Sequence, residues 1–118
     1  MLNLISSSRY KINRIKIKIT VTDLLIKYHI PDNAIINLVF IGKKKMKSIA
    51  AKYKQENTAL PVLSFSYLKN KGMIENENTF AEIFICYPQA VLLAAERDKK
   101  VDTVLDQLIT HGIENVLK

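Results

Sequence analysis

The sequence is poor in cysteine, glycine and arginine, and it lacks long apolar runs. The single cysteine, Cys86, excludes a disulfide within the chain and fits a reducing compartment. The three glycines, Gly42, Gly72 and Gly112, are isolated, which excludes a glycine-rich loop that cradles phosphate groups. The longest apolar runs, such as residues 90–95, are far shorter than the ~20 residues that span a bilayer.

Basic residues outnumber acidic ones by 18 to 11, which gives a net charge of +7. This excess favours a polyanionic partner through electrostatic attraction and counterion release, but it does not choose between RNA, DNA and acidic lipid. Scattered solvated lysines would give the same excess. Only three of the basic residues are arginine, so diffuse attraction is favoured over bidentate phosphate recognition. Without a recognisable signal peptide, we expect a soluble cytoplasmic protein with no membrane partner.

Several segments of the chain have a clear pattern. With 118 residues and 48% hydrophobic content, the chain is long enough for one domain with a real core. The apolar, β-branched run at 34–42 predicts a buried strand. Residues 43–54 have apolar side chains at helical spacing with lysines outside that stripe, which predicts an amphipathic helix with a basic outer face. Strands are expected at 60–67 and 80–87, joined by a loop as in a hairpin.

The two ends of the chain complete the expected α+β domain. Residues 2–6 predict a short strand, Pro88 suits the first turn of a helix, and residues 101–117 predict a last helix. Residues 11–28 are ambiguous. Apolar and polar residues alternate there as in a strand, but the segment also resembles a helix that ends before Pro31. Helices and strands are mixed without a regular βαβ repeat, which favours a small sheet covered by helices.

A histidine in the predicted last helix is a candidate metal ligand. His111 and Asn115 are one turn apart, and we expect them on an apolar seam with Val104 and Leu108. Two ligands at this spacing can converge on one metal ion. An amide oxygen is, however, a poor donor for Zn²⁺, and a histidine on an apolar seam is more often a hydrogen-bonded core residue. Gly112 stands where the glutamate of an HExxH motif would be.

Five segments follow one another along the chain: INLVFIG, a helix ending in AAKYK, VLSFSY, AEIFIC and LITHGIENVL. Their order and spacing resemble those of the YbeY family of single-domain, metal-dependent endoribonucleases that mature ribosomal RNA. The resemblance covers residues 33–117 and extends more loosely before them. It implies a small, mixed, four-stranded sheet packed with helices, and it implies RNA, ribosomal RNA in particular, and the ribosome as partners. It also implies a helix within residues 11–28, although the alternation of that segment is then unexplained.

The site residues of the family can be carried over one position at a time. The resemblance implies three histidines that bind one zinc; His111 matches the first, Asn115 stands at the second, and the third would lie beyond Lys118. Lys54 aligns with the family's arginine, which is associated with RNA phosphate, and is the candidate catalytic residue. Glu82 keeps a carboxylate where the family has an aspartate.

The resemblance implies a zinc-dependent endoribonuclease specific for single-stranded RNA. One imidazole and one amide do not replace three imidazoles, so we predict weak zinc binding and little ribonuclease activity for residues 1–118, with the C-terminal end of the metal-binding region missing. The alternatives are a non-catalytic RNA-binding or ribosome-associated protein of the same fold, and a basic domain whose partner is another protein.

Overall fold

Strands and helices follow one another in the expected order. The computed structural model describes residues 2–55, 58–67 and 79–117. Within these ranges the elements are β1 (Leu2–Ile5), α1 (Arg14–Lys27), β2 (Ile35–Ile41), α2 (Lys43–Lys54), β3 (Val62–Ser66), β4 (Thr79–Cys86), α3 (Tyr87–Glu96) and α4 (Val101–Val116).

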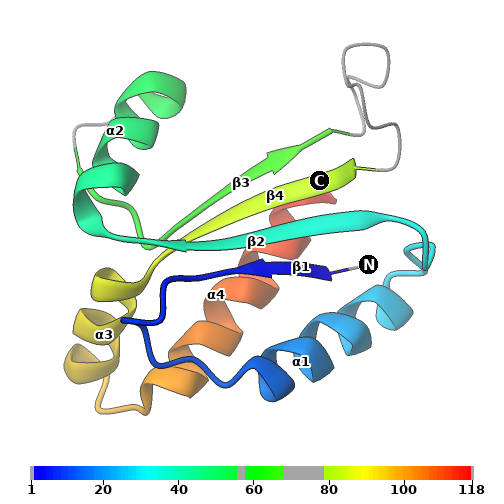
Figure 1. Cartoon of the computed structure of the whole chain (residues 1–118), viewed down its shortest axis with the longest axis horizontal. Coiled ribbons are helices and arrows are strands. Elements are labelled where there is room, and N and C mark those ends of the chain that lie inside the picture. The colour runs from blue at the N-terminus through cyan, green and yellow to red at the C-terminus, as the bar shows by residue number, and fades with distance from the viewer. Residues whose placement is uncertain (1, 56–57, 68–78, 118) are drawn as a thin grey trace.

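The strands form one mixed sheet in the order β1-β2-β4-β3 (Figure 1). β1, β2 and β4 are parallel neighbours, and β3 is antiparallel to β4. The parallel pairing of β1 with β2 needs a crossover connection, which α1 supplies. The antiparallel pairing of β3 with β4 confirms the predicted hairpin-like arrangement, but most of its predicted loop, residues 68–78, lies outside the described residues.

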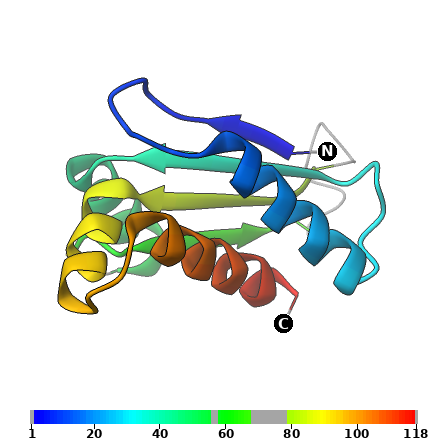
Figure 2. The ribbon, with the colours of Figure 1, turned by 90° about the horizontal axis from the view of Figure 1, so that it is seen from below.

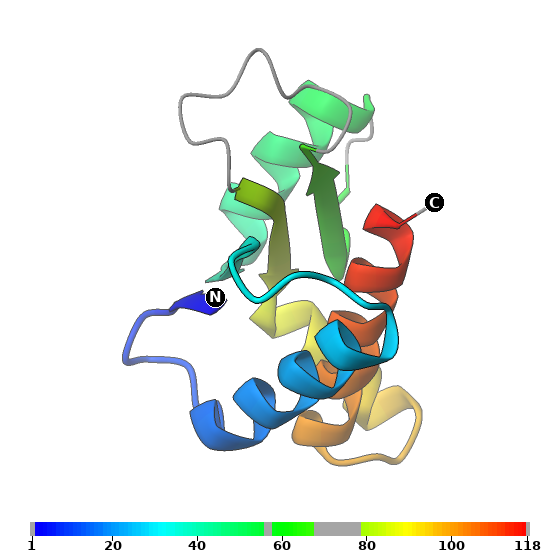
Figure 3. The same ribbon diagram turned by 90° about the vertical axis from the view of Figure 1, so that its right-hand side faces the viewer.

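Different helices cover the two faces of the sheet. Figure 2 shows α1 and α4 in front of the strands, and we call this side the α1/α4 face. Its core cluster joins the sheet to α1, α3 and α4 and includes Ile83 and Ile109, both fully buried. Figure 3 shows α2 on the other side of the strands, the α2 face, where the buried Met46 belongs to a smaller cluster. None of the described helices is long and apolar enough to cross a membrane.

Residues 14–27 form a helix, so the strand interpretation of this segment is wrong. Ile17, Val21 and Leu24 are buried against the sheet at spacings of one helical turn. The alternating Ile15 and Ile19 are instead 76% and 57% exposed. Tertiary packing of the i, i+4, i+7 stripe therefore decides the structure, and the period-2 alternation arises from isoleucines that the core does not use.

The first turn of α1 is capped by a side chain. The carboxamide oxygen of Asn13 accepts a hydrogen bond from the backbone N–H of Lys16 at 3.0 Å. We predict that Asn13→Ala lowers the free energy of unfolding by about 1 kcal/mol, because this N–H loses its partner. Asn13→Ser keeps a capping oxygen and should remain close to the unchanged protein. Urea unfolding followed by circular dichroism measures both, and equal losses in the two variants would contradict a capping role.

Candidate functional site

α4 carries the predicted metal-ligating residues and packs closely against the sheet. Its buried residues are Val104, Leu105, Leu108, Ile109, Gly112, Ile113 and Val116. A Cβ atom built on Gly112 would lie 2.9 Å from Cγ2 of Ile83, 3.1 Å from Oγ of Ser64 and 3.4 Å from Cγ2 of Val62. Glycine at position 112 thus lets the helix backbone approach β3 and β4.

His111 and Asn115 do not face the core, so the expected seam is wrong for these two residues. Val104 and Leu108 are buried, whereas His111 and Asn115 are exposed. Gly112 lies in the buried stripe of α4. Because successive residues of a helix are rotated by ~100°, His111 points away from that stripe. Both side chains share an accessible helix surface, which a ligand can reach.

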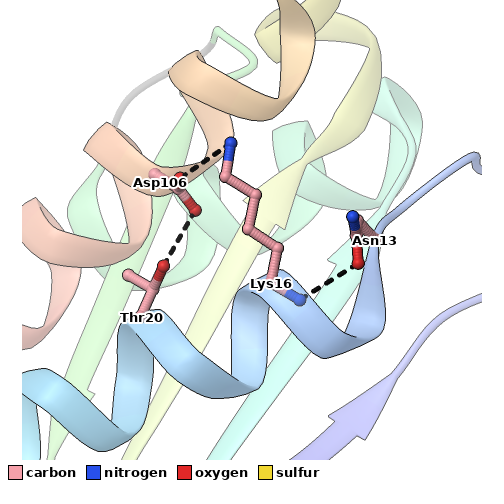
Figure 4. A network of polar contacts seen from close by, with 4 residues as sticks. All are labelled: Asn13, Lys16, Thr20 and Asp106. Atoms are coloured by element: carbon pink, nitrogen blue, oxygen red, sulfur yellow. Dashed lines mark hydrogen bonds and ion pairs between the residues drawn. The ribbon is translucent and has the colours of Figure 1, made fainter.

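Carboxylates near His111 are bound to α1. A shallow hollow of ≈ 290 Å³ is lined by Asp106, Gln107, Thr110, His111 and Glu114. Figure 4 shows Asp106 receiving a hydrogen bond from the hydroxyl of Thr20 at 3.2 Å, beside the ammonium of Lys16 at 3.3 Å. Glu114 accepts a hydrogen bond from the Tyr28 hydroxyl, and this bond raises the pKa of Tyr28. The two carboxylates therefore hold α4 against α1.

The residues around His111 do not fit a zinc ion. Zinc sites in proteins have three or four ligands, mostly imidazoles, thiolates and carboxylates. Among the described residues, no group of three or more histidine, cysteine, aspartate or glutamate side chains could hold a metal ion. His111 and Asn115 supply one imidazole and one neutral amide. The implied metal therefore has no adequate donor set in the described part of the chain.

Lys54 is not brought together with His111. It is the last residue of α2 and is exposed. α2 and α4 lie on opposite faces of the sheet (Figures 1 and 3), so the lysines of α2 and the histidine of α4 belong to different surfaces. A ligand that contacts Lys54 would therefore bind on the α2 face.

A larger hollow lies on the α2 face beside α2. It has a volume of ≈ 520 Å³, and we call it the sheet-face cavity; its lining residues are Lys45, Ile49, Tyr53, Phe65, Tyr67, Glu82 and Phe84. The three residues from α2 are at i, i+4 and i+8, so they form one helical stripe above the sheet. Of these residues, only Glu82 was a candidate from the sequence, as the position that keeps a carboxylate of the family. The cavity could have been found from the period-2 pattern of both strands, but only with their register known.

The aromatic rings of the sheet-face cavity form a connected series. Tyr53 and Phe65 meet edge to face, with ring centroids 5.1 Å apart, and Phe65 and Phe84 do so at 5.9 Å. Tyr67 donates its hydroxyl to Oε1 of Glu82. Burial, followed by this hydrogen bond, raises the pKa of Tyr67 to about 12, so the hydroxyl keeps its proton at neutral pH. The cavity thus contains one carboxylate among four aromatic side chains.

Cys86 has no catalytic environment. It ends β4, is fully buried, and packs in the small cluster beneath α2. Burial raises the pKa of its thiol, which disfavours the reactive thiolate. Cys86 is therefore a small buried side chain of the core.

Comparisons with known proteins agree with this fold. The family model described as "Endoribonuclease YbeY" matches residues 5–115. The Endoribonuclease YbeY of Thermodesulfovibrio yellowstonii is 33% identical over 88 residues, which cover 74% of this chain and 54% of that protein. The Endoribonuclease YbeY of a Janthinobacterium species is 31% identical over 78 residues, covering 66% of this chain and 49% of that protein. The chain thus spans about half the length of these curated relatives.

A solved structure supports the same architecture. The solution structure of TM1509 from Thermotoga maritima aligns with all of this chain and with 73% of its own, at a TM-score of 0.63. At 17% identity this likeness concerns the fold alone. It confirms the predicted α+β class with a mixed four-stranded sheet. Because the family model extends from β1 into the last turns of α4, the chain belongs to the YbeY family.

Proposed function

We propose that this chain acts on single-stranded RNA in ribosomal RNA maturation. The observation that carries the proposal is the match to the endoribonuclease family over residues 5–115. The net charge of +7 supports it, because a basic protein binds the phosphate backbone through counterion release. The single-stranded RNA substrate, the role in ribosomal RNA maturation and the ribosome as a partner are all parts of this proposal.

The basic surface of α2 supports binding to RNA. Six of its twelve residues are lysines, and all six are exposed. They include Lys54, whose charge can attract phosphate even though a lysine lacks the bidentate geometry of arginine. On this proposal, the affinity for a single-stranded RNA falls steeply as salt rises. An interface with a protein partner built on an apolar patch would not show this dependence.

The donor set around His111 favours weak catalysis or none. One imidazole and one amide fall short of a zinc site, and the nearby carboxylates Asp106 and Glu114 are bound to α1. The alternative function is a non-catalytic RNA-binding or ribosome-associated protein of the same fold, which would need no metal site. The two functions share an RNA ligand and differ in cleavage.

Metal analysis and cleavage assays separate these two functions. We predict that the purified chain, dialysed against zinc and then buffer, retains far less than one zinc per chain by mass spectrometry. We also predict that its cleavage of a fluorogenic single-stranded RNA is near background and is unchanged in His111→Ala. The matched control is His29→Asn, which changes the other histidine and suits the left-handed backbone at position 29 (φ 54°).

Two results would overturn parts of this proposal. About one zinc per chain, lost in His111→Ala and kept in His29→Asn, together with zinc-dependent cleavage, would establish an active endoribonuclease. Failure to bind single-stranded RNA at low salt would contradict the proposed RNA-directed function as a whole.

A further inference from the structure

The rings of the sheet-face cavity are accessible to a planar ligand. Tyr53 is 56% exposed, and Phe65 and Phe84 are only partly buried. Exposed aromatic rings stack with unpaired nucleobases in many proteins that bind single-stranded RNA. The edge-to-face contact of Tyr53 with Phe65 leaves much of the tyrosine ring uncovered. A base could therefore lie against Tyr53 beside the strands.

One lysine lines the same cavity, and two others are close to its Tyr53. Lys45 lines it, and the ammonium of Lys52 lies 5.2 Å from the centroid of the Tyr53 ring. Lys54 follows Tyr53 directly and is exposed. These charges would attract the phosphates that flank a stacked base. The arrangement combines a ring for the base with cations near that ring for the backbone.

The carboxylate of Glu82 determines which part of a nucleotide fits inside the cavity. Glu82 and Phe65 are direct neighbours in the register of β3 with β4, so a base that contacts one lies beside the other. A carboxylate repels phosphate and accepts hydrogen bonds from N–H groups. The Tyr67 hydroxyl occupies one site on Oε1, and no other described residue hydrogen-bonds to this carboxylate. Within the described part of the chain, the other acceptor positions of this carboxylate are therefore unused.

Guanine matches this carboxylate better than the other bases. Its Watson–Crick edge presents two adjacent donors, the N1–H and the N2 amino group, which can meet both oxygens of one carboxylate. Adenine, cytosine and uracil each place an acceptor next to a donor on that edge, and the acceptor would face a carboxylate oxygen.

From these observations we propose that the sheet-face cavity binds an unpaired guanine of single-stranded RNA, with the carboxylate of Glu82 accepting its N1–H and N2 amino donors and Tyr53 stacking on its ring. The RNA ligand rests on the proposed function; the preference for guanine rests on the cavity alone. The cavity lies on the α2 face, whereas α4, which carries His111, packs on the α1/α4 face (Figures 1 and 3), so the site would hold the RNA and select a base away from His111.

The preference can be measured with three labelled nonamers, UUUUGUUUU, UUUUAUUUU and nine uridines, by fluorescence anisotropy in EDTA, which prevents metal-dependent cleavage. We expect the guanine oligomer to bind about tenfold more tightly than the adenine one, because both purines stack but only guanine offers two donors to Glu82. Glu82→Gln should abolish this difference, since its amide offers guanine one acceptor in place of two, and its N–H and C=O groups can pair with the acceptor and donor of adenine. Tyr53→Ala should weaken binding of all three oligomers.

The matched control is Glu96→Gln, which removes the same charge from an exposed position at the end of α3. It should keep the full preference for guanine. Equal affinity for the guanine and adenine oligomers, or a preference that survives in Glu82→Gln, would overturn the proposal.

If no oligomer binds, the proposed function fails and a second measurement decides this inference. NMR titrations with GMP and AMP should then shift the amide signals of Phe65 and Glu82 with GMP alone. Equal shifts with both nucleotides, or none, would overturn the guanine site.

Discussion

Replacing Ile17 with alanine is expected to lower the free energy of unfolding by about 2–4 kcal/mol, whereas Ile15→Ala should change it by less than about 0.5 kcal/mol. Ile17 is 2% exposed and packs in the core of the α1/α4 face, so the truncated side chain leaves a cavity. Ile15 is 76% exposed and loses few contacts. Urea denaturation of both variants measures the difference.

Ile19→Ala and Val21→Ala complete this series. The helix predicts that Val21, at 1% exposure, behaves like Ile17, and that Ile19, at 57%, behaves like Ile15. If residues 14–27 were a strand, all four side chains would point to the same face and their truncations would have similar effects. Similar losses at Ile15 and Ile17 would therefore contradict the helix.

This segment shows what could be predicted of the fold. The order of elements, the buried β2 and the amphipathic α2 followed from local patterns, because each pattern agrees with one structure. α1 did not, since the alternation from Ile15 to Val21 fits a strand as well as a helix. The parallel pairing of β1 with β2 requires a crossover connection between them, and this requirement favours the helix. No local pattern contains it, and only the family resemblance indicated it from the sequence.

The candidate site was less predictable than the fold. Helical spacing correctly put His111 and Asn115 on one side of α4, but it could not show which side faces solvent, because that depends on where the sheet and α1 lie. The sheet-face cavity depends on two further facts that no local pattern contains. These are the pairing of Phe65 with Glu82 and the position of Tyr53 above them.

Gly112→Ala is expected to lower the free energy of unfolding by about 1–2 kcal/mol, although alanine is the better helix former. Intrinsic propensity alone would make the protein about 1 kcal/mol more stable. The added Cβ, however, would lie 2.9 Å from Cγ2 of Ile83, a fully buried side chain, so that this side chain or the helix has to shift. Overpacking of this kind costs roughly 1–3 kcal/mol or more, and here it outweighs the gain in propensity.

A double-mutant cycle isolates this steric effect. Ile83→Ala alone should lower the free energy of unfolding by about 2–4 kcal/mol, because it creates a cavity. It also removes Cγ2, so adding Gly112→Ala in that background should have little effect or raise stability. If Gly112→Ala stabilises the otherwise unchanged protein, the close approach is not limiting. If it destabilises both backgrounds equally, Ile83 is not the obstacle. The predicted outcome would instead show that the glycine after His111 serves packing, and that it fixes the distance between α4 and the strands that carry the sheet-face cavity.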